Sequence, residues 1–75
     1  MSRIPVVSGR QVVAALTRLG YVAVRQRGSH VRMRHPSDSS RRPVTVPDHR
    51  SLKPGTLHAI LRDANLTVDE LLELI

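Results

Sequence analysis

The residues of this 75-residue chain that are best suited to chemistry lie in one basic run, RQRGSHVRMR at positions 25–34. The second half of the run has the alternation of a β-strand, in which every other side chain points to the same face. His30, Arg32 and Arg34 then share one face, and the two apolar residues between them share the other. Guanidinium groups suit a polyanion, and histidine is the one side chain that ordinarily titrates near neutral pH. The run therefore indicates binding of nucleic acid, its cleavage, or both.

The neighbouring strands extend this face. Gly28 and Ser29 form the tight connection between the first two predicted strands. Strict alternation in the first strand directs Val22 and Val24 toward the core and Ala23 outward. We expect the open sheet face to carry Arg25, Arg27, His30, Arg32, Arg34 and Thr45. Each arginine alone is ordinary solvated surface that discourages edge-to-edge aggregation, but together, beside a histidine, they favour binding of phosphate groups.

The charge balance also favours a polyanionic partner. Twelve Lys and Arg residues, eleven of them Arg, stand against six Asp and Glu, which gives a formal net charge of +6. Residues 1–37 contain no acidic residue, so the positive field belongs to the N-terminal half. The chain has no cysteine, which excludes disulfides and thiolate metal sites. This composition is typical of a small intracellular partner of nucleic acid or of an acidic protein.

The length corresponds to one small domain, residues 1–75, whose core offsets the chain entropy by a small margin. Tyr21 is the only aromatic residue, so aliphatic side chains must fill that core. No stretch has the length of a membrane span, and the N-terminus has no charged-then-apolar leader. We therefore expect a cytoplasmic protein with no membrane partner.

Local signals predict helices before and after the strands. Capping boxes open a first helix, at about residues 8–19, and a short final helix: Ser8 with Gln11, and Thr67 with Glu70. Pro54 fits the first position of a second long helix, which Asn65 can cap. Both longer helices carry apolar stripes at helical spacing, and these stripes must be covered.

Strands are predicted over residues 21–27, 29–35 and 42–46, with a polar loop between the second and the third. Pro43 and Pro47 lack an amide donor, which favours an edge position or strand ends at these two residues. The apolar face of the sheet is the only candidate to cover the helices. The predicted fold is α+β, a two-layer α-β-β-β-α domain with a short C-terminal helix. Its helices cover one face of a three-stranded antiparallel sheet and leave the other open.

Among the ways to cleave a phosphodiester, the sequence favours one without a metal ion. Asp38, Asp48 and Asp63 do not converge at metal-ligand spacing, and no glycine-rich loop precedes a helix. A histidine can instead accept the proton of a ribose 2′-hydroxyl, which attacks its own phosphate while arginines stabilise the charge. DNA lacks that hydroxyl, so this route requires RNA. The acid for the leaving 5′-oxygen stays open among Ser29, Tyr21, an arginine and water.

The remaining histidines are weaker candidates. His35 alternates toward the core at a strand end and is expected to be structural. His49 lies in a polar turn and His58 near a helix start, where loop hydrogen bonding and partial exposure are the ordinary roles. For His30, the residue pattern alone fits a hydrogen-bonded surface residue beside a turn as well as a catalytic base.

Several short motifs resemble, in their order along the chain, the HicA family of toxins from HicA–HicB toxin–antitoxin systems. They are VSG at 7–9, LGY at 19–21, GSH at 28–30, His35-Pro36, VTVP at 44–47 and LKPGTL at 52–57. The resemblance covers nearly the whole chain.

This resemblance implies a double-stranded-RNA-binding-domain-like fold and an mRNA interferase, an endoribonuclease that halts translation. Because the residues favour a metal-free route, we expect no metal or cofactor. The glycine and histidine of the motif map onto Gly28 and His30, with His30 as the catalytic residue. It also implies a HicB-like antitoxin that docks on the toxin and blocks the histidine. RNA contacts are then expected from Arg25, Arg27, Gly28, Ser29, Arg32 and Arg34. We expect the free toxin to be a monomer.

Two other functions stay open on the residues alone. One is a non-catalytic RNA-binding module, in which His30 contacts a phosphate or a base. The other is an interaction domain whose basic face holds an acidic protein.

Overall fold

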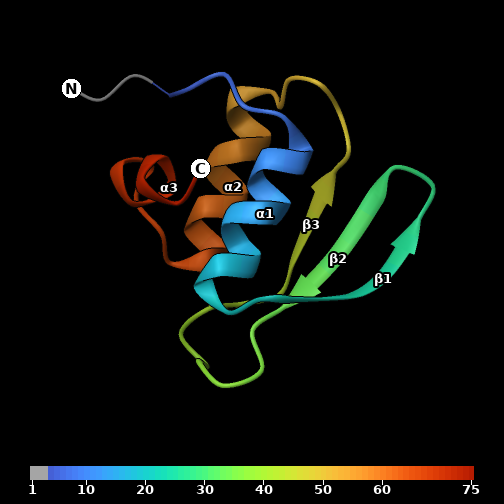
Figure 1. The fold of residues 1–75 in the computed structure, drawn as a ribbon, viewed down its shortest axis with the longest axis vertical. Helices are drawn as coiled ribbons and strands as arrows, with labels where there is room; N and C mark the ends of the chain where they lie inside the picture. The colour runs from blue at the N-terminus through green and yellow to red at the C-terminus, as the bar shows by residue number, and fades with distance from the viewer. Residues whose placement is uncertain (1–3) are drawn as a thin grey trace.

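The computed structural model describes residues 4–75, which contain three helices and three strands in the predicted order. The elements are α1 (Gly9–Leu19), β1 (Val22–Arg27), β2 (His30–Arg34), β3 (Val44–Pro47), α2 (Pro54–Ala64) and α3 (Val68–Leu74). Figure 1 shows the chain running from α1 through the strands to α2 and α3. Each predicted element is confirmed, and none of the described helices is long and apolar enough to cross a membrane.

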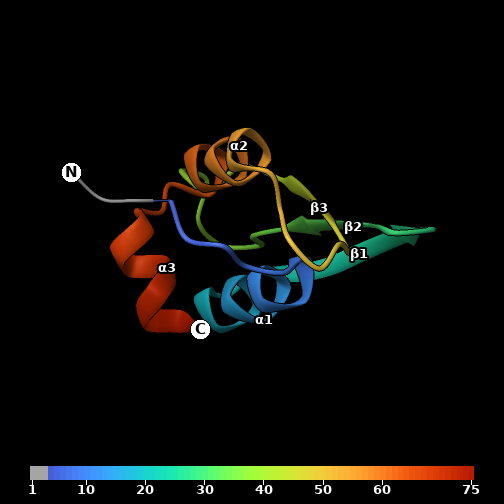
Figure 2. The same ribbon diagram turned by 90° about the horizontal axis from the view of Figure 1, so that it is seen from above.

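The strands form one antiparallel sheet in the order β1-β2-β3. β2 is therefore central and β3 is an edge strand, with Pro43 just before it and Pro47 as its last residue, which agrees with the edge position or strand ends that these prolines predicted. Figures 1 and 2 both place α1 and α2 on one side of the sheet, with α3 beyond them on the side away from the strands. The structure confirms an α+β fold, and the element order agrees with the double-stranded-RNA-binding-domain-like fold that the resemblance implied.

A β-bulge interrupts β1 between Ala23 and Arg25. The extra residue, Val24, shifts the alternation by one position, so that Val22 lies on the open face and Ala23 on the core face. The prediction that Val22 and Val24 point into the core was wrong, because both are about half exposed. Figure 1 also shows the tip of the β1–β2 hairpin projecting away from the helices, and every residue of β1 is exposed.

The hydrophobic core lies between the sheet and the two longer helices. Alternate residues of the two better-covered strands point into it: Val31, Met33, Val44 and Val46. The helices contribute Val12, Ala15, Leu16, Leu57, Ile60, Leu61 and Ala64. Full burial of one such aliphatic side chain stabilises the fold by roughly 1.5–3 kcal/mol. Thr45, between two of the buried valines, points outward as predicted.

The helix ends form where the sequence predicted them. The amide of Gln11 donates to Ser8 Oγ at 3.1 Å, and the amide of Ser8 donates to Gln11 Oε1 at 2.9 Å. Thr67 and Glu70 make the same reciprocal pair at the start of α3. Asn65 ends α2 in the left-handed conformation. These contacts satisfy backbone groups that the helices leave unpaired at their ends.

Gly9 lets α1 begin directly against the end of β3. A Cβ atom on Gly9 would lie 1.9 Å from the carbonyl oxygen of Pro47, far inside van der Waals contact. The Gly9 amide also donates to the carbonyl oxygen of His49 at 2.9 Å. Because Gly9 has no side chain, the first turn of α1 can pack directly against the loop that follows β3.

We predict that Gly9→Ala lowers the free energy of unfolding by about 1–3 kcal/mol, because the added methyl group must push backbone away from backbone. Denaturant-induced unfolding measures the change. Gly55→Ala is the matched control, since a Cβ there meets nothing within 4 Å in the first turn of α2. It should leave stability unchanged or raise it by up to about 1 kcal/mol. Equal stabilities of the two variants would contradict the close packing at Gly9.

Candidate functional site

Three cross-strand rows make up the open face of the sheet. Directly paired residues of antiparallel strands lie side by side on the same face. From the hairpin turn downward, the rows are Arg27–His30–Pro47, Arg25–Arg32–Thr45 and Val22–Arg34. Strand pairing therefore brings together all the basic residues that alternation predicted on this face.

His30 opens β2 directly after the hairpin turn. Gly28 has a left-handed φ of 54°, which glycine adopts without strain, and its carbonyl oxygen accepts a hydrogen bond from Gln26 Nε2 at 3.2 Å. The carbonyl oxygen of Ser29 accepts a hydrogen bond from the amide of Asp48, which ties the turn to the chain after β3. The turn is thus anchored on both sides, and it presents His30 exposed to solvent.

The open face keeps its positive charge. Arg25, Arg27 and Arg34 are exposed, whereas Arg32 is half-buried and donates from Nη1 to Thr45 Oγ1 at 3.0 Å. The ion pairs formed within residues 4–75 involve none of these four arginines. Guanidinium groups without acidic partners, arranged around an imidazole, favour an anionic ligand.

His35 is a structural residue, as predicted. Its Nδ1 accepts hydrogen bonds from the amides of Ser37 at 3.3 Å and Asp38 at 3.0 Å. Because backbone amides only donate, Nδ1 carries no proton and Nε2 donates to the carbonyl oxygen of Leu19 at 3.1 Å. The ring also packs edge-on against Tyr21, with the centroids 5.4 Å apart. Both ring nitrogens are occupied, so His35 is not free to act as a base.

Tyr21 does not fit the role of the acid that the sequence left open. Its side chain is buried, and its hydroxyl donates to the carbonyl oxygen of Arg42 at 2.7 Å. Burial raises the pKa of Tyr21, and the Arg41 guanidinium partly opposes that shift. Tyr21 also directly precedes the first residue of β1, at the end of the strand far from the hairpin turn and His30. The remaining candidates for the acid are Ser29, an arginine and water.

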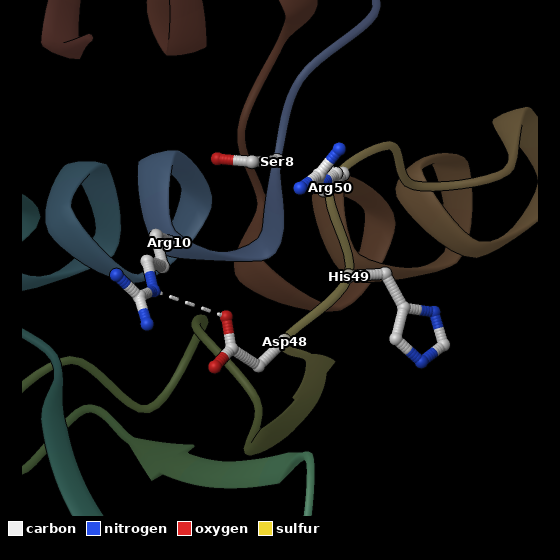
Figure 3. Close-up of a pocket in the computed structure, with 5 residues that line it drawn as sticks. All are labelled: Ser8, Arg10, Asp48, His49 and Arg50. Carbon is white, nitrogen blue, oxygen red and sulfur yellow. Dashed lines mark ion pairs between the residues drawn. The ribbon is translucent and has the colours of Figure 1, made fainter.

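The other two histidines are exposed, one on α2 and one in the loop after β3. The backbone of His49 accepts the hydrogen bond from Gly9, and its imidazole extends outward from the loop (Figure 3). His49 lines a cavity together with Ser8, Arg10, Asp48 and Arg50. Sequence reasoning missed this cluster, because its members are brought together only by the packing of α1 against β3. Within residues 4–75, no three His, Asp or Glu side chains gather closely enough to hold a metal ion.

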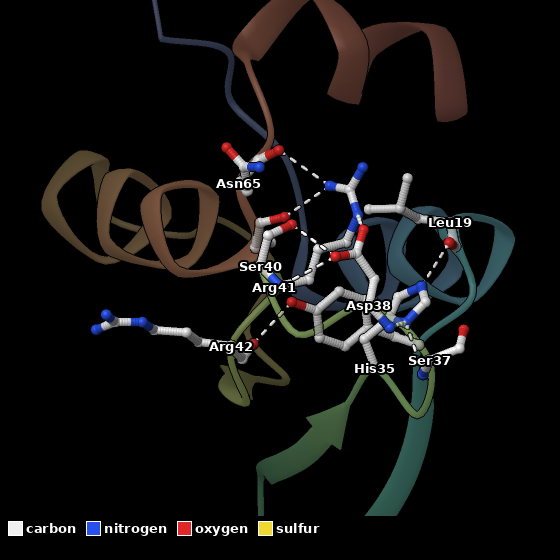
Figure 4. A network of polar contacts seen from close by, with 10 residues as sticks. Leu19, His35, Ser37, Asp38, Ser40, Arg41, Arg42 and Asn65 are labelled. Carbon is white, nitrogen blue, oxygen red and sulfur yellow. Dashed lines mark hydrogen bonds and ion pairs between the residues drawn. The ribbon is translucent and has the colours of Figure 1, made fainter.

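The loop at 36–42, whose role the sequence did not indicate, ties the sheet to the helices (Figure 4). Asp38 Oδ1 accepts hydrogen bonds from the Ser40 amide at 3.0 Å and the Ser40 hydroxyl at 2.6 Å. Asp38 Oδ2 accepts from Arg41 Nε at 3.1 Å. Arg41 Nη1 in turn donates to the carbonyl oxygens of Ala64, the last residue of α2, at 2.8 Å and of its C-cap Asn65 at 2.9 Å. The contacts of Asp38, Ser40 and Arg41 therefore form a clamp. This clamp provides hydrogen-bond donors to the carbonyl oxygens at the end of α2 and fixes the connection between β2 and β3.

Fold and surface together define a class: a small basic α+β protein that presents an exposed histidine on a cationic sheet face. Residues 9–66 match the family model described as the HicA toxin of bacterial toxin–antitoxin systems. Because the match covers most of the chain, the chain belongs to the HicA toxin family, as the sequence motifs predicted. A comparison with curated proteins gives no match.

We predict that the Asp38 contacts make the stability of the fold sensitive to acid. Hydrogen bonds from Ser40, and the charge of Arg41, hold the pKa of Asp38 below its usual value of 3.8. A lowered pKa in the folded state means that the stabilisation is present above pH 3.8 and is lost as the pH falls through the lower folded value. Asp38→Asn should therefore be less stable than the native chain at neutral pH and should lose less stability on acidification.

Denaturant unfolding at a series of pH values from about 6 down to about 2 measures this difference, since the proton linkage acts across that range. Asp69→Asn is the control, because the described hydrogen bonds and ion pairs include none from the Asp69 side chain. Its acid profile should run parallel to that of the native chain. A parallel profile for Asp38→Asn as well would contradict the role assigned to the clamp.

Proposed function

We propose that this chain is a metal-independent endoribonuclease that cleaves mRNA with His30 as its catalytic residue. The observation that carries the proposal is the direct cross-strand pairing of His30 with Arg27, at the exposed end of a cationic face. Membership of a toxin family supports it, since destruction of mRNA stops protein synthesis and growth.

The reaction begins when the unprotonated imidazole of His30 accepts the proton of a ribose 2′-hydroxyl. The 2′-oxygen attacks the adjacent phosphorus, so that a new O2′–P bond forms and the bond to the 5′-oxygen of the next nucleotide breaks. That 5′-oxygen takes a proton from Ser29, an arginine or water. The products are a 2′,3′-cyclic phosphate and a free 5′-hydroxyl, and the protons balance without a cofactor.

The arginines of the face have two roles in this reaction. Side chains that lie directly opposite on paired strands have Cβ atoms about 4.5–5.5 Å apart, so Arg27 and His30 can reach the same phosphate. Arg27 then stabilises the charge that develops on the phosphoryl oxygens. Arg25, Arg32 and Arg34, with the backbone of the hairpin turn, bind neighbouring phosphates and give an affinity that falls with salt.

We further infer that a HicB-like antitoxin neutralises the toxin by covering this face. A cationic surface without internal ion pairs favours an acidic partner, and charge complementarity speeds the encounter. Any partner that binds only the folded chain also stabilises it by mass action, which matters for a core of this size. Binding over His30 would block access of the RNA to the imidazole.

We predict that His30→Ala abolishes growth arrest on expression and lowers the rate of RNA cleavage by about 10²- to 10⁴-fold, the usual contribution of a general base. Cleavage of an RNA oligonucleotide is measured in the presence of EDTA, in which the native chain should stay active. His58→Ala is the matched control, since His58 is an exposed histidine on α2. It should cleave at the native rate.

Equal growth arrest by the native chain and His30→Ala would contradict the catalytic role. RNA that is bound with a steep salt dependence, yet stays intact in the presence of the native chain, would favour the non-catalytic RNA-binding module instead. If the native chain did not bind RNA even at low salt, both RNA-directed functions would be contradicted. The function that would then stay open is that of an interaction domain for an acidic protein.

A further inference from the structure

A second cationic cluster lies beside the proposed site, around a cavity of about 400 Å³. The cavity lies between the start of α1 and the loop after β3, and Figure 3 shows its lining side chains. They are Ser8, Arg10, Asp48, His49 and Arg50. The proposed chemistry of His30 does not use any of them.

Strand pairing places this cavity next to His30. Pro47, the last residue of β3, pairs directly with His30, and Asp48 follows it in the chain. The Asp48 amide donates to the carbonyl oxygen of Ser29, the residue before His30. Consecutive Cα atoms are 3.8 Å apart, so the backbone of His49 lies at most about 8 Å from that of Pro47. A nucleic acid strand bound over His30 would therefore reach the cavity with an adjacent nucleotide.

The charges of the cavity favour an anion. Arg10 and Asp48 point toward each other, with Arg10 Nε 3.5 Å from Asp48 Oδ1, and this pair accounts for the only carboxylate among the lining residues (Figure 3). Arg50 is exposed and takes part in no ion pair of the described residues, whereas the His49 imidazole points away from Arg10 and Arg50 (Figure 3). The net charge of the lining is therefore positive.

Side chains rather than the end of α1 would hold the anion here. The Gly9 amide already donates to the carbonyl oxygen of His49, and the Gln11 amide already donates to Ser8 Oγ. The hydrogen bond from Gly9 to His49 also fixes the loop that carries Arg50. Guanidinium groups offer planar donors that match the oxygens of a phosphate group.

We propose that Arg50, beside the Arg10–Asp48 ion pair, forms a subsite that binds the phosphate of a nucleotide flanking the cleaved bond. The inference rests on the proposed function and deepens it, because the subsite extends the RNA-binding surface from the sheet face around the end of β3. The bound RNA then follows a path from the arginines of β1 and β2, across His30, to the loop at 47–50.

Binding of a six-nucleotide single-stranded RNA to His30→Ala protein tests the subsite without interference from cleavage. Arg50→Gln in that background should weaken binding by about 3- to 10-fold and lower the slope of log affinity against log salt by about 0.7, the value for one phosphate contact on a single strand. Arg50→Glu should weaken binding further. Arg62→Gln is the matched control, because Arg62 is an exposed arginine in the last turn of α2. It should bind as the parent does, and thermal unfolding of each variant checks the fold.

Equal affinity and salt slope for Arg50→Gln and Arg62→Gln would overturn the subsite. If the native chain still cleaved RNA through His30, this result would contradict the subsite alone and would leave the proposed function supported. Absence of both cleavage by the native chain and RNA binding by His30→Ala would overturn the proposed function together with the subsite.

Discussion

The alternation of buried and exposed side chains along β2 is the constraint on which the candidate site depends. Val31 and Met33 are buried in the core, so the residues between and beside them must point to the open face. A slip of one residue would expose both apolar side chains and force His30 and Arg32 toward the core. Burial of charged or polar groups without partners costs far more than the apolar burial contributes. The position of the imidazole is therefore set by packing on the opposite side of the sheet.

Contacts at the two ends of the sheet hold this register in place. At one end, Gly9 lets α1 pack against the end of β3, and the hairpin turn is hydrogen-bonded to the same segment. At the other end, the clamp around Asp38 and Arg41 joins the sheet to the end of α2. His35 belongs to this second set, with both ring nitrogens hydrogen-bonded. The structure thus distinguishes His35, which stabilises the fold, from His30, which is exposed on the open face of the sheet.

The sequence predicted the parts of the fold that depend on local signals. Capping boxes at Ser8 and Thr67, the apolar stripes of the two longer helices and the alternation in β2 and β3 all act over a few residues, and the structure confirms them. The bulge at Val24 was not predictable, because apolar–polar alternation in β1 reads equally well with or without an extra residue. The bulge leaves Arg25 and Arg27 on the predicted face. It changes the face only of Val22 and Ala23, which precede it.

The clamp and the cavity beside the site escaped prediction for a different reason. Their members come from segments distant in the sequence, such as Arg41 with the end of α2, and Arg10 with Arg50. No local pattern marks such a pair, since the contact depends on how helices and loops pack. The family motifs, by contrast, marked His30 directly, although the structure was needed to show its pairing with Arg27.

The most direct test of the proposed chemistry is the identity of the RNA ends that the native chain produces in the presence of EDTA. Attack by the ribose 2′-hydroxyl predicts a 2′,3′-cyclic phosphate on one fragment and a 5′-hydroxyl on the other, with no cleavage at a position where the 2′-hydroxyl is replaced by hydrogen. Fragments that carry a 5′-phosphate, or cleavage at the deoxy position, would contradict the role of His30 as the base for that hydroxyl.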